Sequence, residues 1–199
     1  MTERPTRGLS RQEVLGGALA AGGALAGGLL LGGSPDAAES QSGAASQTEA
    51  LNAILRLERI QAALYAEARD SGILSGELAA MASTLAAQES EHVDTLTGLL
   101  GDDAEDAPAL NFGRATRDAD AFGQAAMQLE DLASRFYNVQ VPSLNGEALR
   151  AVLRIVSVEA RHAAWIRDIR GENPAPDAVE PSESAQAVQA ALDKTGFLR

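Results

Sequence analysis

Apolar residues recur at intervals of three and four along four segments of the chain, the spacing of one buried helical face. The first segment starts at the capping box Ser46-Gln47-Thr48-Glu49 and runs to the turn signal at residues 70–72. The others span about residues 75–100, 118–140 and 146–170 and end at glycine or proline. The pattern therefore predicts an all-α fold with four long helices and no strands.

The connections between these segments predict how the helices are arranged. Short turns at residues 70–72 and 142–146 make each consecutive pair of helices antiparallel. The connection at residues 101–118 has no helical period, and in an extended form it covers more than ~50 Å. This length lets the chain return along the bundle, so the second and third helices run parallel and are joined by one long crossover.

A polar pattern interrupts the apolar faces. Each of the two histidines follows a glutamate by three residues, and a lone glutamate lies in the helix upstream of each pair. Residues three apart share one helical face. This is the ligand set of di-iron and di-manganese centres in four-helix bundles. The candidate metal ligands are Glu58, Glu89, His92, Glu130, Glu159 and His162.

The spacing of the glutamates from the turns predicts that they meet. Glu58 and Glu89 flank the first turn, and Glu130 and Glu159 flank the second. Each is about 15 residues from its turn, or roughly 22 Å along a helix, so all four carboxylates are expected at one level. The alternative is that the Glu-x-x-His pairs are ordinary surface pairs. Four buried carboxylates without cations would be strongly unfavourable, so burial would favour metal.

Two tyrosines repeat the spacing of the lone glutamates. Tyr65 follows Glu58 by seven residues and Tyr137 follows Glu130 by seven, which returns each to the face of its glutamate. They are candidates for hydrogen bonds to metal-bound carboxylates or for radical transfer. The alternative is that they fill the core with a polar tip. We expect Glu91, next to His92, to face solvent.

The charge and the cysteine content limit the classes of partner that the protein is expected to bind. The formal net charge is −12 and the chain has no cysteine, which excludes disulfides and thiolate ligands. The acidic balance argues against nucleic acid and anionic membranes and favours cations. Carboxylates suit iron or manganese, and imidazole raises the affinity for later divalent metals. We expect two metal ions, iron before manganese; a homodimer is compatible with the sequence.

Both ends of the chain differ from the predicted bundle at residues 47–171. Residues 1–38 combine early arginines with the uncharged run Val14 to Gly33 and a small-residue exit, which is typical of an export signal. An uncleaved membrane anchor is the alternative, since about 20 residues can span a bilayer. Residues 39–46 are expected to form a linker. The tail at residues 172–199 is Pro-rich at first and then predicts a short amphipathic helix at about residues 183–194.

Four stretches carry a resemblance to a known family: LNAILRLERIQAALYAEA, QESEHVDTLTGLLG, MQLEDLASRFYNVQVP and IVSVEARHAAWIRDIRGENPAP. They resemble the bacterial ferritin-like domain family of exported proteins over about residues 48–178. The resemblance implies a ferritin-like four-helix bundle, a non-haem di-metal site and export signals. The stretch SRQEVLGG resembles a twin-arginine signal, with Gln12 in place of the second arginine.

The leading functional hypothesis is an exported di-metal oxidoreductase that acts on oxygen, peroxide or ferrous iron. In it Glu89 and Glu159 bridge the two metals, while His92 and His162 each bind one. Glu58 and Glu130 are terminal or bridging ligands. The alternative is a non-catalytic metal-binding or structural protein of the cell envelope. The mature domain is not expected to insert stably into a membrane.

Overall fold

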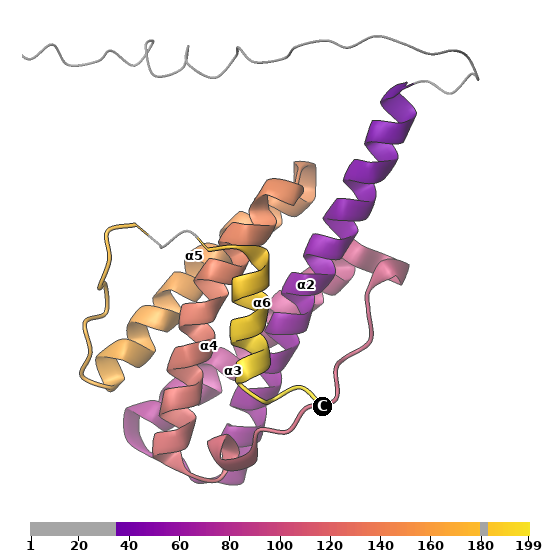
Figure 1. The fold of residues 1–199 in the computed structure, drawn as a ribbon. Coiled ribbons are helices and arrows are strands. Elements are labelled where there is room, and N and C mark those ends of the chain that lie inside the picture. The colour runs from indigo at the N-terminus through magenta and orange to yellow at the C-terminus, as the bar shows by residue number, and fades with distance from the viewer. Residues whose placement is uncertain (1–34, 180–182) are drawn as a thin grey trace, which may run out of the picture. The chain divides into compact units, whose positions relative to one another are not determined.

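The computed structural model describes residues 35–179 and 183–199 (Figure 1). Most of the predicted export signal lies in residues 1–34, outside this range. The described chain forms four long α-helices, three short 3-10 turns and one short C-terminal helix. The long helices are α2 (Pro35–Ser71), α3 (Gly76–Leu100), α4 (Ala119–Gln140) and α5 (Gly146–Ile169). The prediction of an all-α bundle is confirmed.

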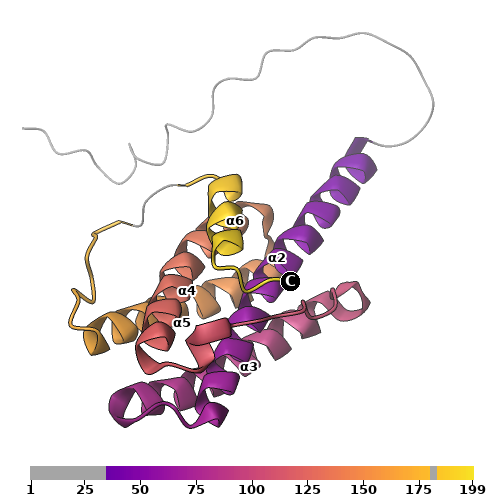
Figure 2. The ribbon, with the colours of Figure 1, turned by 60° about the horizontal axis from the view of Figure 1, so that its bottom comes forward.

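The four long helices pack in two antiparallel pairs, α2 with α3 and α4 with α5 (Figures 1 and 2). In Figure 1, α3 and α4 rise in the same direction, as expected from one long crossover between them. The packing of α2 on α4 and of α3 on α5 completes the bundle. Each of the four helices therefore has one face turned toward a common interior.

The first helix starts earlier than its capping box predicts. α2 begins at Pro35, so the start expected at Ser46 is wrong, and residues 39–46, for which we expected a linker, are helical. Proline suits the first position of a helix, because the N–H that it lacks has no partner there. The Ala, Ser and Glu residues that follow are compatible with continued helix. A sequence signal for a start at one point does not prevent an earlier start.

The crossover at residues 101–118 is held to α2 by hydrogen bonds and to the C-terminal residues by a β-bridge. It contains the 3-10 turns η1 (Gly101–Asp103) and η2 (Gly113–Thr116), which its lack of period did not predict. The amide of Asn52 on α2 donates to the carbonyl of Asp103 at 2.8 Å and accepts from the N–H of Glu105 at 2.9 Å. An isolated antiparallel β-bridge joins Leu110 to Leu198. The crossover therefore covers the α2 and α4 side of the bundle.

The tail ends in α6 (Ala185–Lys194), close to the short helix predicted at 183–194. Its start is capped by the hydroxyl of Ser184, which accepts from the N–H of Ala187 at 3.2 Å. Val188 and Leu192 are buried, and α6 lies along α4 in Figure 1. The turn η3 (Val141–Ser143) connects α4 to α5. Among the described helices, none has an apolar stretch long enough to cross a bilayer.

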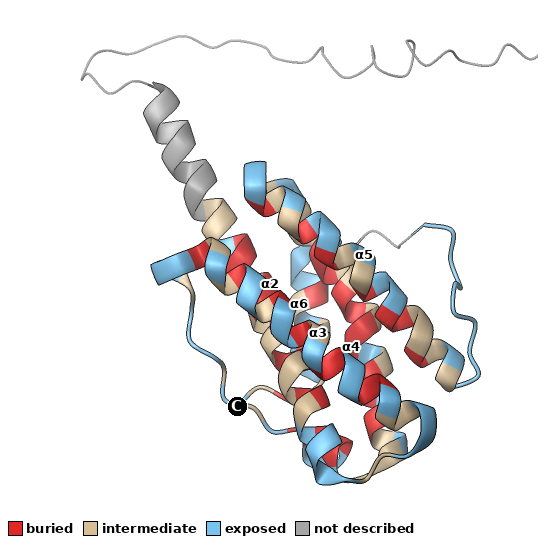
Figure 3. Ribbon diagram, turned by 180° about the vertical axis from the view of Figure 1, so that it is seen from behind, coloured by how far each residue is buried: buried red, intermediate tan, exposed pale blue. Residues whose placement is uncertain are grey.

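The apolar core consists of two clusters with a polar layer between them. Buried residues form the inner face of each helix and exposed residues the outer face (Figure 3). On α2 one cluster contains Leu51, Ile54 and Leu55, and the other begins at Leu57. The boundary on α2 falls between Leu55 and Leu57, next to Glu58, and on α3 and α5 the Glu-x-x-His pairs separate the two clusters. This core seals the layer from above and below.

Candidate metal centre

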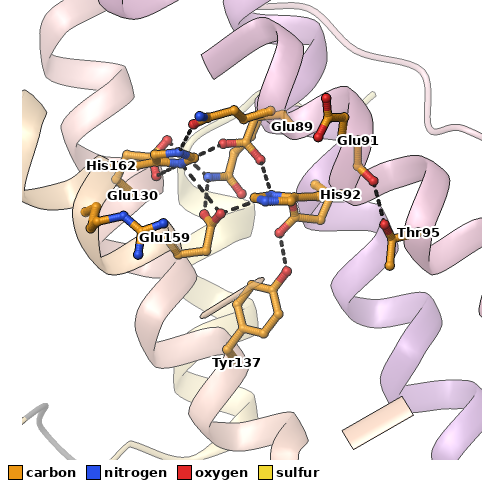
Figure 4. Close-up of polar contacts among 12 residues, drawn as sticks. Glu89, Glu91, His92, Thr95, Glu130, Tyr137, Glu159 and His162 are labelled. Carbon is orange, nitrogen blue, oxygen red and sulfur yellow. Dashed lines mark hydrogen bonds and ion pairs between the residues drawn. The ribbon is translucent and has the colours of Figure 1, made fainter. Parts of the chain in front are cut away.

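The six predicted ligands lie together in the middle of the bundle (Figure 4). α2 supplies Glu58 and α4 supplies Glu130; α3 and α5 each supply one Glu-x-x-His pair. The four glutamates have no solvent exposure, and the relative exposure is 8% for His92 and 3% for His162. The expected placement of the carboxylates at one level is thus observed, and the pairs are not surface pairs.

The cluster divides into two overlapping groups of four side chains. One group contains Glu58 and His92, the other contains Glu130 and His162, and both contain Glu89 and Glu159. Within each group one donor atom per residue lies within 4.8 Å of all the others. The geometry therefore offers two neighbouring cation positions with two carboxylates shared between them.

The two shared carboxylates face both imidazoles. Oε1 of Glu89 lies 3.0 Å from Nδ1 of His162, and its Oε2 lies 3.1 Å from Nδ1 of His92. Oε1 of Glu159 lies 3.2 Å from Nδ1 of His92 and 3.5 Å from Nδ1 of His162. Each of these carboxylates can therefore contact a cation at either position, which fits the bridging role inferred from the sequence.

Four buried atoms of the candidate ligands lack hydrogen-bond partners. They are Oε1 of Glu89, Oε2 of Glu130, Oε1 of Glu159 and Nδ1 of His162. Unpaired buried acceptors are strongly unfavourable, and the three oxygens lie 3.0–3.7 Å from Nδ1 of His162, so one bound cation would satisfy all four atoms. The donor set of carboxylate oxygens and imidazole nitrogen is one that iron and manganese accept. The residues present therefore fit a metal ion at this position.

Hydrogen bonds hold the other carboxylate oxygens in place. The phenol of Tyr137 donates to Oε1 of Glu58 at 2.5 Å, and the phenol of Tyr65 donates to Oε1 of Glu130. The amide of Gln61 donates to Oε1 of Glu130 at 3.1 Å and to Oε2 of Glu159 at 3.2 Å. These donors orient the carboxylates so that their remaining oxygens point into the cluster.

The two imidazoles differ in their outer contacts. Nε2 of His162 lies 2.7 Å from Oε1 of Gln88, an acceptor, so Nε2 carries the proton and Nδ1 presents its lone pair to the cluster. Nδ1 of His92 lies 3.0 Å from Oε2 of Glu58. In the described chain no side chain bonds Nε2 of His92. Only His162 therefore has its orientation fixed from outside.

Burial raises the pKa of all four carboxyl groups of the cluster. The pKa of Glu58 rises to about 8, first through burial and then through repulsion from Glu89. Burial, with repulsion from Glu159, also raises the pKa of Glu89, and it raises that of Glu130 well above its usual value. Burial and repulsion from Glu58 raise the pKa of Glu159. Without cations, the cluster therefore retains protons that exposed carboxyls would have lost.

The same surroundings shift the two histidines in opposite directions. Burial lowers the pKa of His162. Burial also opposes the protonation of His92, but the carboxylates of Glu159, Glu58 and Glu89 beside its Nδ1 outweigh it and raise the pKa of His92 to about 12. In the metal-free cluster His92 is the internal counter-ion of the carboxylates, and a metal ion at its position must displace that proton.

Sequence reasoning missed Gln61 and Gln88. Gln61 is fully buried and follows Glu58 by three residues, so it shares the face of that glutamate. Gln88 directly precedes Glu89, and periodicity alone gives no sign that it contacts His162 on another helix. The signal that was present is a polar residue at a core position of α2. Glu91 is exposed, as expected.

Comparison with known proteins agrees with this geometry. The family profile described as a ferritin-like domain matches residues 46–172, which include α3, α4, α5, α2 from residue 46 onward and all six candidate ligands. No curated protein matches the chain. The match ends before α6. The chain belongs to the ferritin-like domain family.

Proposed function

We propose that this protein binds two divalent metal ions in the centre of its bundle and acts as an oxidoreductase on dioxygen, peroxide or ferrous iron. The four unpaired buried atoms of Glu89, Glu130, Glu159 and His162 are the observation that carries the proposal. A pair of metal ions at a carboxylate-bridged centre supplies Lewis acidity and, with iron or manganese, electrons. Iron is the preferred occupant and manganese the alternative.

The charges of the cluster support two cations rather than one. Four ionised carboxylates carry a charge of −4, and two divalent ions balance it while both imidazoles are neutral. One divalent ion would leave two buried carboxylates to be neutralised by protons. Each ion would be held by the shared carboxylates of Glu89 and Glu159, one further carboxylate and one imidazole.

The protein side chains have separate roles in this proposal. Glu58 with His92 and Glu130 with His162 hold one metal each. Tyr65, Tyr137 and Gln61 fix the direction of the carboxylates, and Gln88 fixes the tautomer of His162. The apolar clusters on both sides exclude bulk water, which strengthens the electrostatic interactions within the centre.

A second candidate function is metal binding without turnover. The complete burial of the four glutamates favours it, since closed sites are typical of structural metals. The two functions differ in what happens when ferrous iron meets air. A structural site would keep its metal and show no oxidation, whereas an oxidoreductase would oxidise ferrous iron at a rate that depends on the centre.

Elemental analysis followed by aerobic addition of ferrous iron separates these functions. We expect two metal ions per chain, and then a rise in near-ultraviolet absorbance faster than that of ferrous iron in buffer. The variant Glu89→Gln should lose this rise, whereas the exposed Glu147→Gln on α5 should keep it. Tight metal with no accelerated oxidation would support the structural function, and the absence of bound metal would contradict both.

We also propose that the protein is exported, on the basis of the composition of residues 1–38. The mature chain would then lack about the first 35–45 residues, a range set by where the apolar run ends. Intact mass spectrometry of the protein from its native host measures this directly. A full-length chain in the soluble cytoplasmic fraction would contradict the proposal.

A further inference from the structure

The two halves of the centre are related by an approximate repeat of the sequence, and the repeat is broken beside one histidine. Glu89 and His92 on α3 correspond to Glu159 and His162 on α5. The residue before Glu89 is Gln88, whose Oε1 accepts from Nε2 of His162 at 2.7 Å. The corresponding residue before Glu159 is Val158, which has no acceptor to offer His92.

The two halves of the repeat also differ in the residue that follows the lone glutamates Glu58 and Glu130 by three positions. Gln61 follows Glu58 by three residues and donates to Glu130 and Glu159. The corresponding residue after Glu130 is Ala133, which is buried and apolar. The position made by Glu130 and His162 is therefore held by both glutamines and Tyr65, whereas that of Glu58 and His92 is held by Tyr137 alone.

The less constrained position is also the one that opens to solvent. A groove with a volume of about 240 Å³ lies between α3 and α5, and its lining includes Glu91, His92, Ala151, Arg154 and Val158. The side chain of His92 is 10% exposed, against 4% for His162 and none for the four glutamates. α3 and α5 face the viewer in Figure 3, on the side away from the crossover and α6.

A larger cavity gives a competing route. It has a volume of about 440 Å³ and lies between α4, α5 and the tail, lined in part by Asp131, Arg135, Ala160 and Arg167. None of the six candidate ligands lines it. An ion pair of 2.6 Å between Arg167 and Asp131 lies at its wall, and Arg135 pairs with Glu183 at 2.7 Å.

We propose that the groove between α3 and α5 is the entrance of the centre, through which divalent cations enter and leave beside His92. This inference rests on the proposed metal binding. Glu91, which is exposed, and His92 both line the groove, and the two residues are neighbours on α3 (Figure 4). The metal held by Glu58 and His92 therefore exchanges first, and the metal held by Glu130 and His162 exchanges after it.

The test is release of manganese from the loaded protein into excess EDTA, followed by electron paramagnetic resonance. We expect two kinetic phases of equal amplitude. The variant Val158→Gln places an acceptor beside His92 and should slow the fast phase by about tenfold, the scale of outer hydrogen bonds to metal ligands. The reverse variant Gln88→Val removes the bond to His162 and should accelerate the slow phase to a similar extent.

Two matched variants on α5 identify the route. Ala151→Trp fills the groove and should slow the fast phase, whereas Ala160→Trp fills the larger cavity and should leave both phases unchanged. Circular dichroism checks that each variant is folded, and Val158→Gln and Ala151→Trp test the groove independently. Slowing by Ala160→Trp alone, or a single phase unaffected by any variant, overturns the inference. A protein that retains no manganese, iron or other divalent metal contradicts the proposed function itself.

Discussion

The phenol of Tyr137 on α4 donates a 2.5 Å hydrogen bond to Oε1 of Glu58 on α2, and Tyr65 on α2 donates in return to Glu130 on α4. Each tyrosine thus donates its hydrogen bond to the glutamate of the other helix. Seven residues separate glutamate and tyrosine along each helix, which is about 10 Å. Because α2 and α4 are antiparallel (Figure 1), this spacing places the two tyrosines on opposite sides of the carboxylate level, and each phenol reaches the glutamate of the neighbouring helix from its own side.

Removal of one hydroxyl should weaken the metal centre without emptying it. Tyr137→Phe leaves Oε1 of the buried Glu58 without its donor, so we expect a loss of stability of about 1–3 kcal/mol. We also expect a 10–100-fold lower metal affinity at the position of Glu58 and His92, because the carboxylate loses its orientation. Calorimetric titration with manganese and thermal melts measure the two effects.

A control for this variant is a buried hydroxyl far from the centre. The hydroxyl of Thr116 donates to Oε1 of Glu67 at 2.6 Å and Thr116 is buried. Thr116→Val should lower the stability by a similar amount and leave metal affinity unchanged. Equal metal affinities for Tyr137→Phe and the unmutated protein would contradict an orienting role for this tyrosine.

The sequence predicted this cluster because its geometry follows from local rules. Residues three apart share one helical face, and residues at similar distances from a turn lie at the same level of the bundle. These two rules predict from the sequence alone that Glu58, Glu89, Glu130 and Glu159 lie together. The helix ends at Gly101 and near residues 118, 140 and 146 followed equally local signals. The family profile and the fold agree with that part of the reasoning.

The hydrogen-bond partners of Tyr65 and Gln88 were not predicted, because they depend on how the helices pack against one another. Periodicity places Tyr65 on the same face as Glu58, but only the antiparallel packing of α2 on α4 directs it to Glu130. The contact of Gln88 with His162 depends in the same way on how α3 packs against α5. The early start of α2 was missed because a capping box marks a favourable start without excluding helix before it.

Shared and unshared ligands should differ in how many metal ions they affect. Glu89→Gln removes a carboxylate that both groups share and should lower the binding of both ions. His162→Ala removes a ligand of one group and should reduce the stoichiometry from two to one. Elemental analysis after gel filtration counts the ions. Glu147→Gln, an exposed change on α5, is the control and should retain both ions. Equal losses for Glu89→Gln and His162→Ala would contradict the shared role.

α6 should contribute to stability but not to metal binding. Leu192 is 1% exposed and packs in the core cluster that α4 shares, so Leu192→Ala should destabilise the fold by about 2–5 kcal/mol. No residue of α6 belongs to the candidate centre. Metal stoichiometry should therefore stay unchanged below the melting temperature. The exposed Gln186→Ala on the same helix should change stability by less than about 0.5 kcal/mol. A lower stoichiometry for Leu192→Ala would mean that the tail shapes the centre.

Stability of the metal-free protein should fall as pH rises, and metal should reverse this trend. The pKa of Glu58 is 4.5 in an exposed chain and about 8 in the folded protein. Between these values the folded state binds more protons than the unfolded state, so its stability decreases as pH rises. His92 acts in the same direction above its usual pKa of 6.5, because its folded pKa is about 12.

Metal ions compete with these protons, so their affinity should rise over the same pH range and their binding should release protons. When free metal is about 100 times its dissociation constant, binding to the folded state alone adds about 2.7 kcal/mol of stability. Melts from pH 5 to pH 8.5 with EDTA or with manganese test both statements. Glu58→Gln cannot ionise, so its metal-free melting temperature should depend less on pH. A metal-free melting temperature that rises from pH 5 to pH 8 would contradict the shifted carboxyl groups. A melting temperature that manganese leaves unchanged at every pH would contradict the centre.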